Sequence, residues 1–172
     1  MSESLTITAT EKEALYAEIM PQIASVLANE TNVIANLANT SAILKECFNF
    51  FWVGFYLVDE TVPKGAPEQL VLGPFQGPLA CTRIRKGKGV CGNAWQECRT
   101  LIVPDVEKFP GHIACSSLSK SEIVIPIIKE DKVVAVLDID SEEVNTFDTV
   151  DQLWLEQLAE LLASKIVAKD EK

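Results

Sequence analysis

The sequence predicts an α+β fold in which a central antiparallel sheet carries the N- and C-terminal helices on one face and a ligand pocket on the other. Helical spacing of apolar residues is strongest at the two ends of the chain, and short strands joined by hairpins and loops occupy the middle. A chain of 172 residues with 48% hydrophobic content suits one compact domain, which buries roughly 70% of its unfolded surface. We therefore expect residues 1–172 to form a single domain.

The formal net charge of −10 disfavours two classes of partner. Nucleic acids and anionic membranes are bound mostly through Lys and Arg, so neither is expected here. The N-terminus has neither the basic region nor the apolar core of a secretory signal, and a cytoplasmic protein is expected. In that reducing compartment, five cysteines indicate metal binding, catalysis or packing, and not a permanent disulfide framework.

Two helices are expected first. The first covers residues 11–30, where Pro21 predicts a kink or a restart. The second covers residues 32–48, and Cys47 lies beside its apolar stripe, which favours a packing role for this thiol.

Strands are expected at 51–58 and 69–75, with a loop at 60–67 between them. Alternation places Trp52, Gly54 and Tyr56 on one face, and the glycine predicts a shallow hollow between the two aromatic rings. Residues 76–88 are Gly-rich and basic, which indicates a loop; this loop carries Arg83 and Arg85.

The remaining elements are a short helix at 90–99, a strand at 101–104, a hairpin formed by 122–128 and 132–140, and a closing helix over about 148–168. Asp148 is a plausible N-cap of that last helix. Its predicted buried stripe comprises Val150, Trp154, Leu158, Leu161 and Ile166.

Two carboxylates end the second strand of the hairpin. Simple alternation places Asp138 and Asp140 on one face with Val134 and Val136, and Val133 on the other. A two-residue turn would direct Glu122 away from both acids, whereas a three-residue loop would pair Glu122 with Asp140. We predict the odd-numbered loop or an equivalent bulge, which gathers all three acids.

The stretch from Gly111 to Pro126 contains a thiol, the only histidine and a carboxylate. Cys115 and His112 lie among small polar residues, and Glu122 opens the apolar run that follows. Reactive groups are often held on loops by a rigid strand, so this stretch is a candidate reactive loop. The alternative is an ordinary surface loop with an inert cysteine.

Two other motifs have to be weighed. Gly87 to Gly92 matches G-x-G-x-x-G with Asp105 downstream, but the basic residues before it and the short helix after it argue against a dinucleotide site. A zinc site is the second alternative, with Cys81, Cys91, Cys98, His112 and Cys115 as its candidate ligands. The separations contain no Cys-x-x-Cys pair, so the zinc signal is weak.

Seven stretches together resemble the free methionine-(R)-sulfoxide reductases, which are enzymes built on a GAF domain. They are Phe-Trp-Val-Gly-Phe-Tyr from Phe51, Leu-Gly-Pro-Phe-Gln-Gly from Leu72, Ala-Cys-Thr-Arg-Ile from Ala80, Gly-Lys-Gly-Val-Cys-Gly from Gly87, Pro-Gly-His-Ile-Ala-Cys from Pro110, Lys-Ser-Glu-Ile-Val from Lys120 and Leu-Asp-Ile-Asp-Ser from Leu137. The resemblance implies a GAF fold over nearly the whole chain. It also implies that the protein is a reductase.

The resemblance implies a thiol mechanism with no cofactor of the protein's own. Cys115 would be the nucleophile that forms a sulfenic acid, and Cys81 would be the principal resolving thiol. Cys91 would be either an alternative disulfide partner or the attacking group. Thioredoxin would reduce the resulting disulfide.

Free methionine sulfoxide presents an ammonium, a carboxylate, a polar S=O bond and a methyl group. Glu122 and Asp138 are expected to bind the ammonium, and a protonated Asp140 would donate to the sulfoxide oxygen. Trp52 and Tyr56 would hold the methyl group.

Three points stay open at this stage. Backbone N–H groups or the loop around Arg83 and Arg85 would meet the substrate carboxylate. His112 would support the loop or favour the Cys115 thiolate, the first being the preferred interpretation. A homodimer through the terminal helices is also compatible with the sequence.

A different functional class has to be kept as the alternative. Many GAF domains bind small ligands such as cyclic nucleotides without turnover, and this chain could be such a sensor. The thiols and acids are what favour the enzyme.

Overall fold

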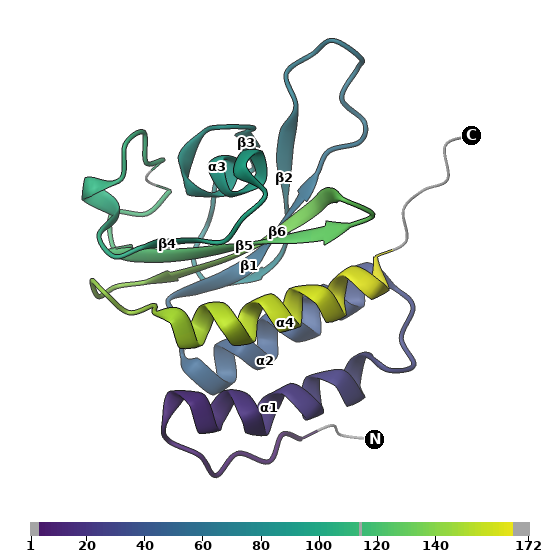
Figure 1. The fold of residues 1–172 in the computed structure, drawn as a ribbon, viewed down its shortest axis with the longest axis vertical. Coiled ribbons are helices and arrows are strands. Elements are labelled where there is room, and N and C mark those ends of the chain that lie inside the picture. Colours follow the sequence, from purple (N-terminus) through teal and green to yellow (C-terminus); the bar gives the residue numbers. More distant parts are fainter. Residues whose placement is uncertain (1–3, 114, 167–172) are drawn as a thin grey trace.

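The computed structural model describes residues 4–113 and 115–166 (Figure 1). The helices are α1 (Lys12–Leu27), α2 (Val33–Phe48), α3 (Gly89–Glu97) and α4 (Thr149–Lys165), with a short 3₁₀ turn at Val106–Lys108. The strands are β1 (Trp52–Val58), β2 (Gln69–Gln76), β3 (Arg83–Arg85), β4 (Leu101–Val103), β5 (Ser121–Lys129) and β6 (Lys132–Ser141).

The strands form one sheet in the order β3-β2-β1-β6-β5-β4, and every neighbouring pair is antiparallel. Helices α2 and α4 cover one face, and α1 packs on their outer side as a third layer (Figure 1). Helix α3 and the longer loops lie on the opposite face. The predicted α+β architecture, with terminal helices on one face, is therefore confirmed.

Alternation along β1 separates two apolar clusters. Val53 and Phe55 point toward α1, α2 and α4, where they join the main core around Tyr16 and Ile19. Trp52 and Tyr56 point to the other face and pack in a second cluster under α3. The predicted division of β1 is confirmed, and it leaves the α3 side for the pocket.

The β5–β6 hairpin contains a bulge, which is one of the two arrangements predicted to bring Glu122 beside Asp140. Glu130 and Asp131 form a two-residue turn with φ of +50° and +62°, the left-handed pair of a type I′ turn. The register then shifts between Ile127 and Ile128, and Glu122 pairs with Asp140. The predicted register of Glu122 is therefore confirmed.

The same bulge corrects the prediction for two valines. Simple alternation assigned Val134 to the face of the acids and Val133 to the other. In the structure Val133 is buried in the α3-side cluster and Val134 packs against the main core. One extra residue in the strand exchanges the two faces at this point.

Helix α1 runs through Pro21 without interruption, so the helix does not restart there. Pro21 is solvent-exposed, while Ile19 and Ile23 on either side are completely buried. Burying two such side chains contributes about 3–6 kcal/mol, which is enough to offset the roughly 3 kcal/mol cost of a proline inside a helix.

The buried face of helix α4 differs from the one predicted. Its buried residues are Asp151, Leu155, Leu158, Ala159, Leu162 and Ala163, whereas Val150, Trp154, Leu161 and Ile166 are only partly buried. Asp148 is the N-cap, as predicted, within a capping box shared with Asp151. The helix ends at Lys165, and the predicted extension to Ala168 falls outside the described residues.

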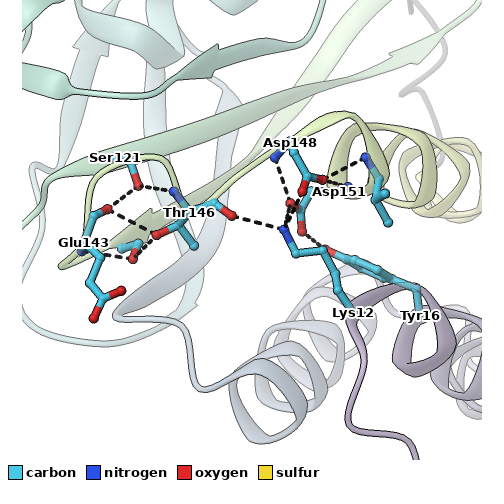
Figure 2. A network of polar contacts seen from close by, with 9 residues as sticks. Lys12, Tyr16, Ser121, Glu143, Thr146, Asp148 and Asp151 are labelled. Carbon is cyan, nitrogen blue, oxygen red and sulfur yellow. Dashed lines mark hydrogen bonds and ion pairs between the residues drawn. The ribbon is translucent and has the colours of Figure 1, made fainter.

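The layers of helices are joined by a buried polar network (Figure 2). Asp151 of α4 accepts hydrogen bonds from Lys12 Nζ at 2.6 Å and from Tyr16 OH at 2.8 Å. Lys12 also donates to the carbonyl of Thr146, whose N–H donates to the hydroxyl of Ser121. The network therefore connects α1 to the start of the strand that carries Glu122.

Within residues 4–113 and 115–166, no helix is long and apolar enough to cross a membrane.

We expect Asp151→Ala to lower the free energy of unfolding by about 2–4 kcal/mol, because it removes charge-assisted hydrogen bonds and the reciprocal half of the capping box. Urea unfolding followed by far-UV circular dichroism would measure the loss. Tyr16→Phe, which removes only one of these bonds, should cost less than Asp151→Ala. An Asp151→Ala variant as stable as the parent would show that the network does not hold α1 on α4.

Candidate active site

A pocket opens on the sheet face opposite α2 and α4. Its floor is formed by β1, β5 and β6, and one wall by the N-terminal turn of α3. The residues at its rim are Pro78, Leu79, Ala80, His112, Ile113, Cys115, Ser116 and Ser119. The empty space in the hollow is about 580 Å³ when the part open to solvent is included. The sequence-predicted site residues Trp52, Tyr56, Cys91, Cys115, Glu122, Asp138 and Asp140 all line it.

A disulfide joins Cys81 and Cys115, whose Cα atoms are 5.7 Å apart. This is the pairing that the family resemblance implies. Cys115 is exposed and Cys81 is half-buried, so the bond lies at the rim of the pocket and not in the core. A sulfur pair in such a position is accessible to an external thiol.

The candidate zinc ligands do not all come together in this structure. Cys81 and Cys115 are bonded to each other, and Cys98 is exposed in a separate hollow beside Glu156. The dinucleotide motif also lacks its context, because α3 has nine residues and only the three-residue strand β3 precedes it.

Three carboxyl groups lie together on the floor, two of them buried and the third, Asp140, half-buried. Glu122 is 6% exposed and Asp138 is 7% exposed, and Asp140 pairs with Glu122 across β5 and β6. Burial raises the pKa of each carboxyl well above its usual range, and the charge of a neighbouring acid raises it further. The cluster therefore tends to hold protons until a cation or another charge partner arrives.

Asp138 has an unmet hydrogen-bonding requirement. Its Oδ1 is buried and has no hydrogen-bond partner among the described residues. An unpaired buried acceptor costs about 1–3 kcal/mol, which a ligand that donates to it can recover. The Asp138 carboxyl is thus a ready acceptor for an ammonium group.

Cys91 lies in the first turns of α3 beside these acids. Its sulfur and one oxygen each of Glu122 and Asp138 lie within 4.8 Å of one another. Burial raises the pKa of this thiol, and the charges of Asp138, Glu122 and Asp140 raise it further. A thiol in this environment stays protonated at neutral pH and is a poor nucleophile.

Trp52 and Tyr56 form one aromatic wall. The sequence predicted a hollow between their rings, and the structure has none at that place. Their ring centroids are 6.0 Å apart and the rings are tilted by only 23°. A Cβ added at Gly54 would meet Phe75 Cβ at 2.3 Å and Trp52 Cη2 at 2.8 Å. The glycine therefore makes room for Phe75 and for the indole, and the ligand space lies beside the stacked pair.

The polar ends of both aromatic residues hold the segment that leads to Cys81. Trp52 Nε1 donates to the carbonyl of Pro78 at 3.1 Å, and Tyr56 OH donates to the carbonyl of Cys81 at 2.8 Å. Sequence analysis missed this role. Trp and Tyr have polar tips that usually find partners when buried, but the sequence does not show which carbonyl they meet.

Ser119 is a second residue that sequence analysis missed. Its buried hydroxyl donates to Asp140 Oδ1 at 2.6 Å, and it also lines the pocket. This bond lowers the pKa of Asp140 but is outweighed by burial and by Asp138. The only available signal was the run of serines after Cys115.

His112 lies next to Glu122, with 3.6 Å between Nε2 and Oε2. Burial lowers the pKa of this imidazole, which favours its neutral form. A neutral imidazole cannot stabilise a thiolate by charge. The geometry therefore favours the supporting role over thiolate activation.

Arg83 and Arg85 do not reach the pocket. They belong to the edge strand β3, where a loop had been predicted, because Gln69, Leu70 and Val71 of β2 pair with this segment. Arg83 forms an ion pair with Asp59, and both arginines line a separate hollow. Neither arginine is therefore placed to meet a ligand in the pocket.

The six-stranded sheet with a pocket opposite the terminal helices defines a GAF domain, and the model of that family matches residues 37–167. GAF domain-containing protein A of Dictyostelium discoideum is 60% identical over 94% of this chain and 99% of its own. The free methionine-R-sulfoxide reductase of Escherichia coli is 41% identical over 94% of each chain.

A crystal structure points the same way. Free methionine-R-sulfoxide reductase from Neisseria meningitidis, solved in complex with its substrate, has a TM-score of 0.90 and 54% sequence identity, and the match covers 94% of each chain. The chain belongs to the family of the free methionine-R-sulfoxide reductases.

The acid cluster predicts a pH-dependent stability. The pKa values of Glu122, Asp138 and Asp140 are raised in the fold, so between pH 4 and those values the folded state holds more protons than the unfolded state. The free energy of unfolding therefore falls as pH rises through this window. We expect the stability of Asp138→Asn relative to the parent to increase with pH, measured by urea unfolding without substrate at pH 5, 6, 7 and 8.

Glu160→Gln, at an exposed position of α4, is the matched control for this experiment. A stability difference between Asp138→Asn and the parent that stays constant from pH 5 to pH 8 would contradict the shifted titration.

Proposed function

We propose that this protein reduces free L-methionine (R)-sulfoxide to methionine through Cys115. The observation that carries the proposal is the coexistence, in one pocket, of a disulfide between Cys81 and Cys115 and a buried acid cluster with an unpaired oxygen. The relatives named above as free methionine-R-sulfoxide reductases support the substrate and its stereochemistry.

The proposed chemistry begins with the reduced pair. The Cys115 thiolate attacks the sulfoxide sulfur, the oxygen is transferred to Cys115, and methionine leaves after one proton has been taken up. Cys81 then attacks the sulfenic acid sulfur, and the hydroxyl leaves as water with the Cys81 proton. The disulfide between Cys81 and Cys115 is the oxidised product of this sequence.

Cys115 is preferred to Cys91 as the attacking group. Cys115 lies on the exposed loop at the rim, whereas burial and three neighbouring acids raise the pKa of the Cys91 thiol. A thiol that resists ionisation attacks slowly at neutral pH. We therefore assign Cys91 to the wall of the pocket, next to Asp138.

The acids supply the polar contacts that the substrate needs. The ammonium would donate to Asp138 Oδ1 and to Glu122, and it would thereby satisfy the unpaired acceptor. Asp140, whose pKa is raised by burial and by Asp138, would donate a proton toward the sulfoxide oxygen as charge develops there. Trp52 and Tyr56 would contact the methyl group from their shared wall.

The same contacts explain why a free amino acid would be the substrate. A methionine within a peptide has no ammonium, so Asp138 and Glu122 would stay buried without a cation. The pocket is closed below by the sheet and has no room for a chain that continues through its floor.

Thioredoxin is the proposed reductant, and the cytoplasm the proposed location. The disulfide at the rim is accessible, and a dithiol protein can exchange with it. No metal or organic cofactor enters the proposed cycle. A GAF sensor that binds without turnover is the alternative, and the disulfide at the pocket favours the enzyme.

We expect Cys115→Ser to lower turnover of L-methionine (R)-sulfoxide by at least about a thousandfold, because it removes the attacking sulfur. Methionine release in the presence of thioredoxin, thioredoxin reductase and NADPH measures it, and Cys98→Ser at an exposed position is the control. After one turnover without reductant, peptide mapping should find Cys81 joined to Cys115. Full turnover by Cys115→Ser would reject the assignment.

We expect N-acetylation of the substrate to lower kcat/KM by about 10²–10⁴-fold, because it removes the charge that Asp138 and Glu122 would bind. In Asp138→Asn the ratio of kcat/KM between free and N-acetylated sulfoxide should shrink toward one. An unchanged ratio in this variant would place the ammonium elsewhere.

A further inference from the structure

Large apolar side chains are exposed beside both cysteines of the disulfide. Leu79 is 91% exposed and lies two residues before Cys81, while Ile113 is 39% exposed and lies two residues before Cys115. Leu118, which is 54% exposed, follows Cys115 by three residues. We call Leu79, Ile113 and Leu118 the apolar rim.

The sequence around the apolar rim carries no formal charge. Residues 76–82 and 109–119 contain no Asp, Glu, Lys or Arg, although these residues make up 23% of the chain. The disulfide ties the two segments together, and Leu79 and Ile113 line the mouth of the same pocket. The two segments that carry the sulfur pair thus contribute an uncharged, partly apolar surface in a protein of net charge −10.

We propose that the apolar rim is the docking surface for an external dithiol protein, and that the thiolate of this protein attacks the Cys115 sulfur. The inference rests on the proposed function, since that cycle requires the disulfide to be reduced after every turnover. The occupant is fixed by the chemistry, because a protein that reduces this bond has to cover the residues next to it.

The surface suits a brief encounter with an anionic nucleophile. A thiolate approaching this sulfur pair meets no carboxylate within either segment, so the segments themselves do not repel it despite the acidic chain. Exposed leucine and isoleucine side chains provide apolar contact area without requiring matched charges. A reductant that must leave after each cycle needs only such a small contact.

The two sulfurs differ in accessibility. Cys115 is exposed, whereas Cys81 is half-buried and its carbonyl is held by Tyr56 OH at 2.8 Å. Attack on Cys115 breaks its bond to Cys81, and Cys81 leaves as a thiolate that takes up a proton. The second thiol of the dithiol protein then displaces Cys115, so that two electrons pass to the cysteine pair and the partner becomes a disulfide.

Leu118 is the residue for the test, because it does not line the pocket. The protein is oxidised chemically with diamide and mixed with excess reduced thioredoxin, and the second-order rate constant of disulfide reduction is followed by thioredoxin fluorescence. We expect Leu118→Glu to lower this rate constant at least tenfold, and Leu118→Met to retain most of it. Reduction by dithiothreitol should stay within twofold of the parent in both variants.

Leu153→Glu is the matched control, since Leu153 is similarly exposed on α4 in the opposite layer. The docking surface would be refuted if Leu118→Glu reacted with thioredoxin at the parental rate, if dithiothreitol reduction fell equally, or if Leu153→Glu had the same effect.

A thioredoxin variant without its resolving cysteine identifies the attacked sulfur. Peptide mapping of the trapped mixed disulfide should find Cys115, and a mixed disulfide at Cys81 would overturn the assignment. Because the disulfide is made with diamide, these measurements do not depend on sulfoxide turnover. Reduction by thioredoxin without sulfoxide activity would refute the proposed function and leave the docking surface standing.

Discussion

The pairing of Glu122 with Asp140 across β5 and β6 is the constraint on which the site depends. A type I′ turn would by itself direct Glu122 to the helix side, where the core is apolar. The bulge near Ile127 adds one residue and returns Glu122 to the face of Asp138 and Asp140. The pairing of the two hairpin strands is thus what brings the three acids together.

Gathering these acids has an energetic consequence for the protein without ligand. Their raised pKa values follow from burial and from one another, and Asp138 keeps an oxygen without a partner. The rest of the fold has to offset the free-energy cost of these clustered acids. It does so through the apolar core under the sheet and through the Lys12, Tyr16 and Asp151 network behind it.

The redox pair depends on a different part of the structure. The polar tips of Trp52 and Tyr56 hold the carbonyls of Pro78 and Cys81. Cys115 belongs to a loop whose Ser119 donates a hydrogen bond to Asp140 of β6. The rigid sheet therefore positions both sides of the disulfide, although both cysteines lie outside regular elements. The acid cluster and the disulfide are therefore held by the same strands.

The sequence by itself determined the α+β class, most element positions and the identity of the thiols and acids, because hydrophobic periodicity and residue chemistry are local properties. Only the tertiary structure decided which sheet faces Val133 and Val134 occupy and which residues of α4 are buried. It also decided that Arg83 pairs with Asp59 and does not reach the pocket. The same holds for the packing of Trp52 against Gly54 and for the hydrogen bond from Ser119 to Asp140. Each of these outcomes depends on which distant surface an element packs against, and that choice is made by the whole core and not by neighbouring residues.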